Sequence, residues 1–403
     1  MRVNVEIPGR PDIVIDDAVL SPFIAKLQPA TPNRTAYAAA RIVLHDDYAQ
    51  VTHTPTAPAT PDELAPFIDW DASAAHRRWL GSHGFGIAEA MDTAQRFAIG
   101  WPNARALIER CAALDLEHGF VAGAGADGLT DSSTPAALVD EVVEQAAFID
   151  AHGGIAVLLP LPALMHHGAD ESGFVEVYRE IIKQAPGPLI LHWLGPQFMP
   201  VLDGYFPGDS FQRILALDPD KVIGCKLSLL DSDFEIKIRR ACLPRRQVVL
   251  TGDDWNFSDL ILGSDSIASQ EETAPDSRVV NDISFALGDF SHALLGVFDG
   301  IAAPAGLALR LLAQGDTESY RAIMHPCETL GRQIFAPPVS GYKAGLAFLA
   351  WLDGRQSNPF LANHEQTLRS KEHLLEVAAL AANAGLFTNA SITTERLRAF
   401  AAD

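Results

Sequence analysis

Short apolar runs alternate with helix-like stretches through most of the chain. Short strands that are apolar on both faces and separated by helices are typical of parallel βα units. Eight such strands in series predict an α/β fold, a closed (β/α)₈ TIM barrel rather than an open doubly wound sheet. The runs lie at Arg41–Leu44 and at residues 83–88, 119–123, 155–159, 188–193, 222–228, 247–251 and 292–298, with helical patterns at 69–80, 97–116, 135–152 and 171–184.

The predicted barrel covers residues 38–306 and has an addition at each end. Residues 1–37 begin with two strand-like runs split by Pro8-Gly9, which indicate a hairpin. A polar stretch at 264–281 indicates a loop before the last strand. Residues 307–403 form the second addition, a C-terminal helical extension that we expect to pack on the barrel or to form a contact between subunits. Its helical patterns lie at 307–312, 318–333, 343–352 and 371–385.

Net charge and cysteine content indicate which partners and which cellular compartment to expect. The 403 residues carry a net charge of -21, which argues against nucleic acid and anionic membranes as partners. The 4 cysteines form no CxxC pair, which favours reduced thiols over a disulfide frame or a zinc knuckle. The first ten residues hold no apolar signal core, and no run approaches the length of a membrane helix. We therefore expect a cytoplasmic protein.

The glycine patterns do not indicate a nucleotide site. No GxGxxG follows the first strand, and the chain has no GxxxxGK[ST] motif. Gly123–Gly128 is glycine-rich, but its position after a predicted strand is typical of a tight βα turn rather than a phosphate loop.

A single lysine, Lys226, stands in the apolar run Val222–Ser228. An ammonium buried without a partner costs several kcal/mol, so such a lysine is kept mostly where its amine is used. Desolvation lowers the pKa of an amine, and the neutral form can add to a carbonyl and give a Schiff base. The alternative is structural: Lys226 lies at a strand end and reaches solvent, or pairs with Asp253 or Glu89.

Other polar residues gather where the predicted strands end, which is where barrel enzymes carry their chemistry. His192 ends the strand before that of Lys226, and a histidine beside an amine suits proton transfer during imine chemistry. Alternatively, the acidic residues and His192 together bind a divalent cation. His166-His167 reads as a solvated loop pair. The five side chains considered for the cation are Glu89, Asp92, His192, Asp253 and Asp254.

Five segments, in order, resemble those of one family. They are PLILHW at 188–193, IGCKLS at 223–228, VVLTGDD at 248–254, LLAQGDTESYRAI at 311–323 and PPVSGYKAGL at 337–346. The chain resembles the dihydrodipicolinate synthase / N-acetylneuraminate lyase family of class I, Schiff-base (β/α)₈ aldolases over roughly residues 38–350. More narrowly, it resembles an uncharacterised branch that is labelled as a domain of unknown function.

The resemblance implies a covalent imine on Lys226 with no further cofactor, and a homo-oligomer, either a dimer or a tetramer of dimers. His192 falls where the family has a proton-relaying tyrosine. Residues 90–94 match the family's loop that grips a 2-oxo acid, but only Thr93 keeps a hydroxyl there, and Asp92 would repel a carboxylate. We therefore favour a neutral carbonyl or keto-sugar-like substrate. The residues expected to contact it are Glu89, Asp92, Thr93, Trp193, Ser228, Asp253 and Asp254.

Some of these expected contacts have structural alternatives. Asp92 and Thr93 are equally suited to capping the helix that follows them. The Asp253-Asp254 pair is more often structural than chemical in proteins that this chain resembles.

Three hypotheses remain at this point. The first is a lyase, aldolase or dehydratase that forms an imine through Lys226 and acts on a small carbonyl substrate. The second is a metal-dependent isomerase, epimerase or aldolase on the same barrel. The third is a non-enzymatic protein that binds a small molecule.

Overall fold

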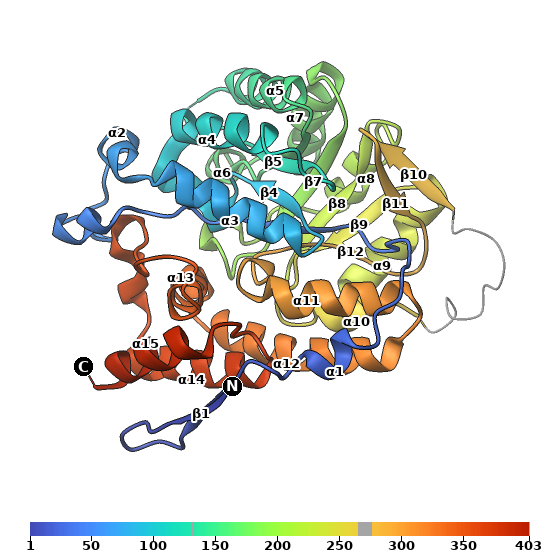
Figure 1. Ribbon diagram of the computed structural model, residues 1–403. Coiled ribbons are helices and arrows are strands. Elements are labelled where there is room, and N and C mark those ends of the chain that lie inside the picture. Colours follow the sequence, from blue (N-terminus) through green and yellow to red (C-terminus); the bar gives the residue numbers. More distant parts are fainter. Residues whose placement is uncertain (130–132, 265–275, 403) are drawn as a thin grey trace.

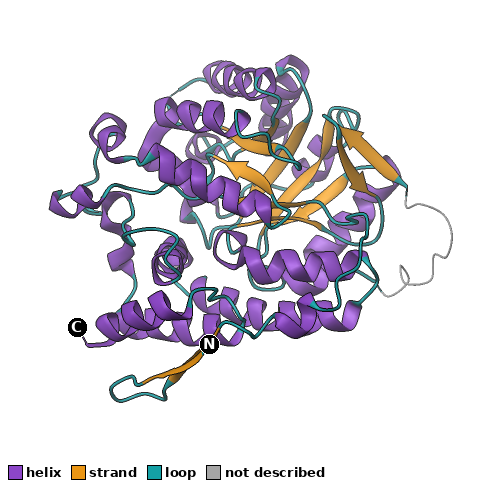
Figure 2. Cartoon of the chain, in the orientation of Figure 1, coloured by secondary structure: helices purple, strands orange, loops and turns teal. Residues whose placement is uncertain are grey.

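The computed structural model describes residues 1–129, 133–264 and 276–402. Its centre is the predicted closed barrel of parallel strands, surrounded by helices (Figure 1 and Figure 2). The eighth strand of the barrel pairs with the seventh on one side and with the first on the other, which closes the ring. The strands are β3 (Ala36–Ala39), β4 (Gly86–Glu89), β5 (Phe120–Ala124), β6 (Ile155–Leu158), β7 (Leu189–Leu194), β8 (Val222–Ser228), β9 (Val248–Thr251) and β12 (His292–Leu295).

A helix follows each barrel strand and covers the outside of the ring. Several of these helices begin at a side chain that accepts a backbone N–H, such as Asp69 and Asp170, which satisfies a donor that the helix leaves free. The helices are α3 (Trp70–Ser82), α4 (Arg96–Ala112), α5 (Pro135–Ala151), α7 (Glu171–Gln184), α8 (Ser210–Leu215), α9 (Ser232–Cys242), α10 (Phe257–Leu262) and α11 (Phe298–Ala313), with the short α2 (Pro61–Leu64) and α6 (Pro162–His166) in loops.

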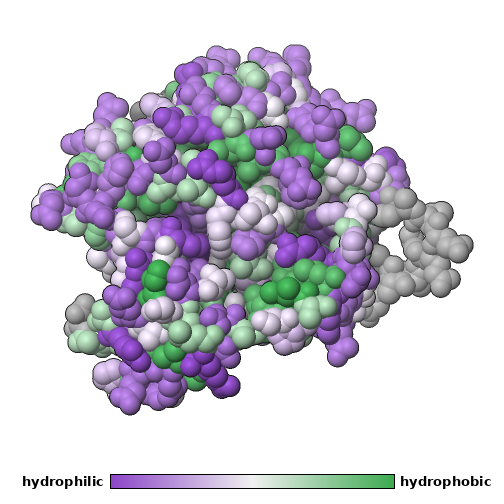
Figure 3. Space-filling view, viewed as in Figure 1, coloured by the Kyte–Doolittle hydropathy of each residue, from purple (hydrophilic) through white to green (hydrophobic). Residues whose placement is uncertain are grey.

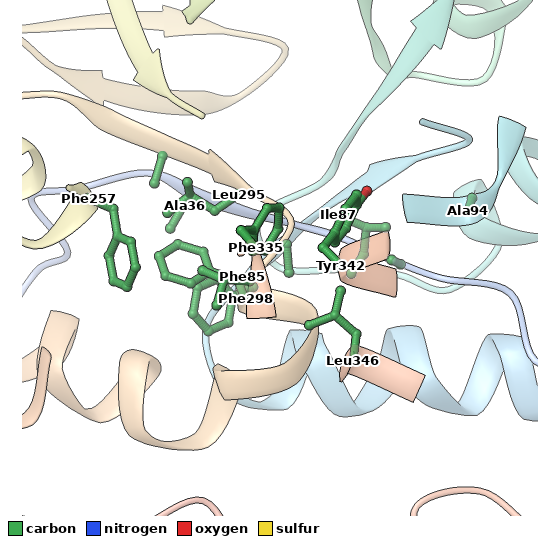
Figure 4. Packing of buried hydrophobic residues seen from close by; sticks show 14 of the residues in the cluster. Ala36, Phe85, Ile87, Ala94, Phe257, Leu295, Phe298, Phe335, Tyr342 and Leu346 are labelled. Atoms are coloured by element: carbon green, nitrogen blue, oxygen red, sulfur yellow. The ribbon is translucent and has the colours of Figure 1, made fainter. Parts of the chain in front are cut away.

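Successive side chains of a barrel strand point alternately into the barrel and toward the surrounding helices, so the core has two layers. One cluster fills the interior of the barrel, and includes Val157, Ile190, Val248 and Leu250. The other lies between the strands and the helices. Figure 4 shows part of this second layer, where Phe85 from the barrel packs against Phe298 with their ring centroids 4.9 Å apart. The interior cluster forms the floor under the barrel mouth.

The first strand lies earlier than the sequence pattern predicts. Residues Arg41–Leu44 are buried as expected, but they leave the barrel instead of pairing in it. Arg41 binds the buried carboxylate of Asp299, and Leu44 makes a single bridge to Ile68. The strand is Ala36–Ala39, so the expected boundary at residue 38 falls inside it.

The eighth unit also differs from the prediction. The expected strand 292–298 ends at Leu295, and α11 begins at Phe298 and runs through the boundary expected at 306. Of the expected loop at 264–281, residues 265–275 lie outside the described residues. The rest holds β10 (Ser277–Val280), which pairs with β11 (Ile283–Ala286) in an antiparallel hairpin. Asn281 and Asp282 form its turn with φ of 46° and 63°, as a primed hairpin turn requires.

The two additions pack on each other as well as on the barrel. The predicted hairpin, β1 (Arg2–Val5) and β2 (Ile13–Asp16), lies against the C-terminal helices, and Figure 1 shows both chain ends on that side. The short α1 (Ser21–Ile24) leads into the barrel. The extension consists of α12 (Thr317–Ile334), α13 (Tyr342–Leu352), α14 (Lys371–Asn383) and α15 (Ala390–Ala402), of which α12 packs on α10 and α11.

The surface is mostly hydrophilic in the view of Figure 3, with hydrophobic patches that include one over α11. Of the helices in the described part of the chain, none combines the length and the apolar character that crossing a bilayer requires.

Candidate active site

Lys226 lies inside the mouth of the barrel. All seven residues of β8 are buried, and the pleat directs Cys225 and Leu227 toward the helices. Lys226 instead lines a cavity at the carboxyl ends of the strands, in register with His192 on β7, and only 9% of it is exposed. The structure therefore does not place this amine in bulk solvent.

Gly252, just after β9, leaves room for the Lys226 side chain. A β carbon at Gly252 would lie 2.8 Å from Cε of Lys226 and 2.2 Å from Oγ of Ser228, well inside van der Waals contact. It would also lie 2.8 Å from the backbone oxygen of Leu227, so close packing against β8 requires the glycine of the VVLTGDD segment.

The cavity around Lys226 has a volume of about 40 Å³. Six of the residues predicted to form the site line it, and they come from four parts of the ring: Asp92, Thr93, His192, Lys226, Ser228 and Asp254. Residues that the sequence did not suggest complete the wall: Ala39, Met91, Arg96, Phe97, Leu159, Pro160, Leu194, Phe198, Gly296, Phe335 and Tyr342.

The Lys226 amine has no ion pair with any described residue, and burial lowers its pKa from 10.5 to about 8. The carboxylates of Asp254 and Asp92 oppose this effect, but they do not cancel it. Asp254 accepts the N–H of Val297 at 2.8 Å. Burial raises the pKa of Asp254, while the Val297 N–H and Lys226 lower it. A buried amine and a buried acid therefore face the same small space.

His192 is held as a neutral imidazole. Burial, and then the charge of Lys226, lower its pKa well below the usual value. Its Nε2 lies 3.3 Å from Oγ of Ser228. Its Nδ1 is buried and bonds no described residue. Such a ring can accept a proton from a molecule in the cavity.

The C-terminal extension supplies one side of the cavity. The Tyr342 hydroxyl donates to Oδ2 of Asp92 at 2.8 Å and lies 2.9 Å from Oγ1 of Thr93. The Tyr342 ring stacks on Phe335 at 4.3 Å between centroids, and Figure 4 shows both rings among core residues. The Lys343 ammonium lies 3.3 Å from each oxygen of Asp92. The resemblance included this segment, GYK at 341–343, but sequence reasoning gave it no role in the site.

Three of the predicted contact residues do not line the cavity. Glu89 binds the buried Arg77, with Nη2 2.7 Å from Oε1. Trp193 points to the helix layer, where its ring lies 4.8 Å from that of Phe211. Asp253 accepts from the backbone N–H groups of Trp255 and Asn256 at 2.9 and 3.0 Å and so shapes the turn after β9. His166 and His167, at the end of α6, also lie outside this wall.

Of the five residues considered for a divalent cation, Asp92, His192 and Asp254 line one cavity, whereas Glu89 and Asp253 do not line it. Glu89 and Asp253 have the separate partners given above, while Asp92 binds Tyr342 and Lys343. Within residues 1–129, 133–264 and 276–402, no group of three or more His, Cys, Asp or Glu side chains is placed to hold a metal ion.

Comparisons with known proteins agree with this fold. Residues 20–402 match the model of a family described as "Protein of unknown function (DUF993)", which confirms the predicted link to an uncharacterised branch. A search of curated proteins found no match. The match includes the whole C-terminal extension as far as residue 402.

Solved structures of the resembled family share the architecture. Dihydrodipicolinate synthase from Oceanobacillus iheyensis is 15% identical, with a TM-score of 0.55 over 85% of this chain and 95% of that one. N-acetylneuraminate lyase from Fusobacterium nucleatum, complexed with pyruvate, is 13% identical, with a TM-score of 0.59 over 89% and 98%. The 2-keto-3-deoxygluconate aldolase of Sulfolobus solfataricus is 11% identical, with a TM-score of 0.52 over 88% and 100%. At these identities the likeness confirms the predicted fold.

Proposed function

The chain belongs to the family described as protein of unknown function (DUF993), and from this premise we propose that it is a lyase that forms a Schiff base through Lys226. In this proposal it cleaves a carbon–carbon or carbon–oxygen bond in a small neutral carbonyl compound, with the lysine itself as the only covalent catalyst. The fold that it shares with a dihydrodipicolinate synthase, an N-acetylneuraminate lyase and a 2-keto-3-deoxygluconate aldolase supports the reaction class.

The observation that carries the proposal is the position of the Lys226 amine inside the barrel mouth, without an ion pair to any residue that the structure describes. With a pKa of about 8, roughly a tenth of the Lys226 amine is neutral at pH 7, against less than a thousandth at the ordinary value. The neutral amine is the nucleophile that adds to a carbonyl carbon. A structural lysine in this position would be expected to have an acidic partner, and Lys226 has no ion pair with a described residue.

The cavity holds groups for each proton transfer of an aldol cleavage. Lys226 Nζ adds to the carbonyl carbon, and the carbonyl oxygen leaves as water once it is protonated. We assign that proton to Asp254, because burial keeps part of its carboxyl protonated near neutral pH. The iminium then accepts the electrons of the breaking carbon–carbon bond, while His192 takes the proton of the β-hydroxyl group.

The remaining steps regenerate the enzyme. The cleaved fragment leaves as an aldehyde, the enamine is protonated on carbon, and water hydrolyses the iminium to release a ketone and free Lys226. Overall, a β-hydroxy ketone gives a ketone and an aldehyde, with no oxidation or reduction. If the β-hydroxyl leaves as water instead, the same imine supports a dehydration.

The charges that line the cavity favour a neutral substrate. Asp92 and Asp254 both line it, and Lys343 is held by Asp92. Arg96 also lines it, but its guanidinium is bound to Asp127 at 2.9 and 3.0 Å. Among the described lining residues, no cation besides Lys226 is therefore free to hold a carboxylate.

Reduction with borohydride tests the imine directly. The protein is incubated with dihydroxyacetone or acetone, reduced, and analysed by intact mass and peptide mapping. We expect one adduct per chain on Lys226, absent in Lys226→Ala and unchanged in Lys237→Ala, which removes an exposed lysine of α9. Binding of these compounds with Lys226 left unmodified would reject the imine and favour the non-enzymatic hypothesis. The predicted dimer or tetramer stays a prediction that light scattering can test.

A further inference from the structure

A second cavity of about 180 Å³ adjoins the one that holds Lys226. It lies at the same mouth of the barrel, beyond the carboxyl ends of β5 and β6. Three residues line both cavities, Phe97, Leu159 and Pro160, so the two spaces share a wall. A molecule bonded to Lys226 that extended past these three residues would reach the larger space.

Most of the side chains that line this second cavity are apolar, although polar atoms also form a substantial part of its wall. Leu129, Leu138, Leu159 and Leu161 contribute to it together with alanines and prolines. Its charged lining residue among those described is Asp127, and both carboxylate oxygens of Asp127 are bound by Arg96. A hydrocarbon group placed here would cover the leucine side chains, which is favourable.

Phe97 marks the rim between the two cavities. It is 50% exposed, although large hydrophobic residues with this exposure are few among those described. Its ring lies where a ligand that spans both spaces would cover it, and covering apolar surface is favourable.

We infer that the second cavity binds an apolar group of the substrate, on the side of the carbonyl away from Lys226. The substrate class is then a neutral ketone or aldehyde with a hydrocarbon tail or an aromatic ring. This inference rests on the proposed function for the carbonyl end. The volumes agree with it: about 40 Å³ holds little more than the reacting carbons, whereas about 180 Å³ exceeds the roughly 150 Å³ of an apolar cavity that binds benzene.

Alcohols test the apolar site without any imine. The dissociation constants of 2-butanol, 2-hexanol and 2-octanol are measured by ligand-observed NMR on the full chain and on Lys226→Ala. We expect binding to tighten about threefold to fourfold per methylene in both proteins. Affinity that does not depend on chain length would overturn the inference.

Filling the cavity provides the matched comparison. Ala126→Phe places a ring in the second cavity at a position that does not itself line the cavity of Lys226, and we expect it to abolish the dependence on chain length. Ala163→Leu, a smaller change in the same lining, should reduce the dependence. Ala113→Phe, on an exposed position after α4, should leave it as in the parent. Equal slopes in all four proteins would also contradict the inference.

Borohydride trapping with acetone and 2-octanone separates the two proposals. If both label Lys226 and 2-octanone does so at lower concentration, both proposals are supported. If both label it equally well, the imine stands and the apolar site is rejected. If the alcohols bind with the expected dependence on chain length but neither ketone labels Lys226, the apolar site stands and the proposed function fails.

Discussion

Replacing Lys226 with methionine should make the protein more stable. Burial moves the pKa of this amine from 10.5 to about 8, and at 1.36 kcal/mol per pH unit the charged form costs about 3 kcal/mol in the folded state. Methionine is similar in length and carries no charge. Because Asp254 loses a nearby cation in the variant, we expect a gain of about 2 kcal/mol in the free energy of unfolding at pH 7.

The pH dependence of the free energy of unfolding tests whether the charge of Lys226 causes this gain in stability. Between pH 8 and 10.5 the unfolded chain binds a proton on Lys226 that the folded chain has lost, so the free energy of unfolding of the parent protein rises with pH in this window. The difference in the free energy of unfolding between Lys226→Met and the parent protein should be largest below pH 8 and should disappear above about pH 10.5.

Urea unfolding at pH 7 and pH 9.5, followed by tryptophan fluorescence, measures both effects. Lys343→Met is the matched control, because Lys343 is equally buried but lies 3.3 Å from both oxygens of Asp92. We expect this control to lose at least about 1 kcal/mol. If Lys226→Met were destabilised as much as Lys343→Met, the Lys226 amine would have a stabilising partner, and the reasoning for an amine kept for chemistry would fail.

Three further predictions concern the site. The rate of borohydride trapping should rise about tenfold per pH unit below pH 8 and level off above it, as more Lys226 becomes neutral, and a rise that continues to pH 10 would show an ordinary lysine. Gly252→Ala should slow trapping at least tenfold, because its β carbon would lie 2.8 Å from Cε of Lys226, whereas an unchanged rate would show that the strand end can move. Tyr342→Phe removes the hydrogen bond to Asp92 and should cost about 1–2 kcal/mol in thermal unfolding, and no loss would mean that water replaces the hydroxyl.

The strands of the barrel could largely be predicted because their signal is local. The run Val222–Ser228 is β8 from end to end, since a buried parallel strand is continuously apolar and turn residues bound it. The first strand was misplaced for the same reason. Ala36–Ala39 is mostly alanine, which is a weak strand former, and Arg41–Leu44 is a better match to the pattern. The run Arg41–Leu44 lies outside the barrel, where Arg41 binds Asp299, a residue far along the chain. The local sequence does not show this contact.

The orientation of acidic residues after a strand could not be predicted. Side chains alternate between the two faces of the sheet only as far as the strand extends. The local sequence therefore does not show which of the carboxylates of Asp253 and Asp254 faces the cavity. Asp253 binds the backbone of its own turn, while Asp254 is directed into the cavity by the N–H of Val297, 43 residues later. Likewise, Arg77 on α3 holds Glu89 and leaves Asp92 to line the mouth. Each choice depends on a partner from another element.

The C-terminal extension contributes part of the wall around Lys226. Phe335 and Tyr342 line the same cavity as Asp92, Thr93 and Lys226, and their two rings are stacked. Burial is the largest cause of the lowered pKa of Lys226, and these two residues of the extension are part of the wall that surrounds it. The helices after the barrel therefore belong to the proposed active site as much as the strands do, which is consistent with a family match that runs from residue 20 to residue 402.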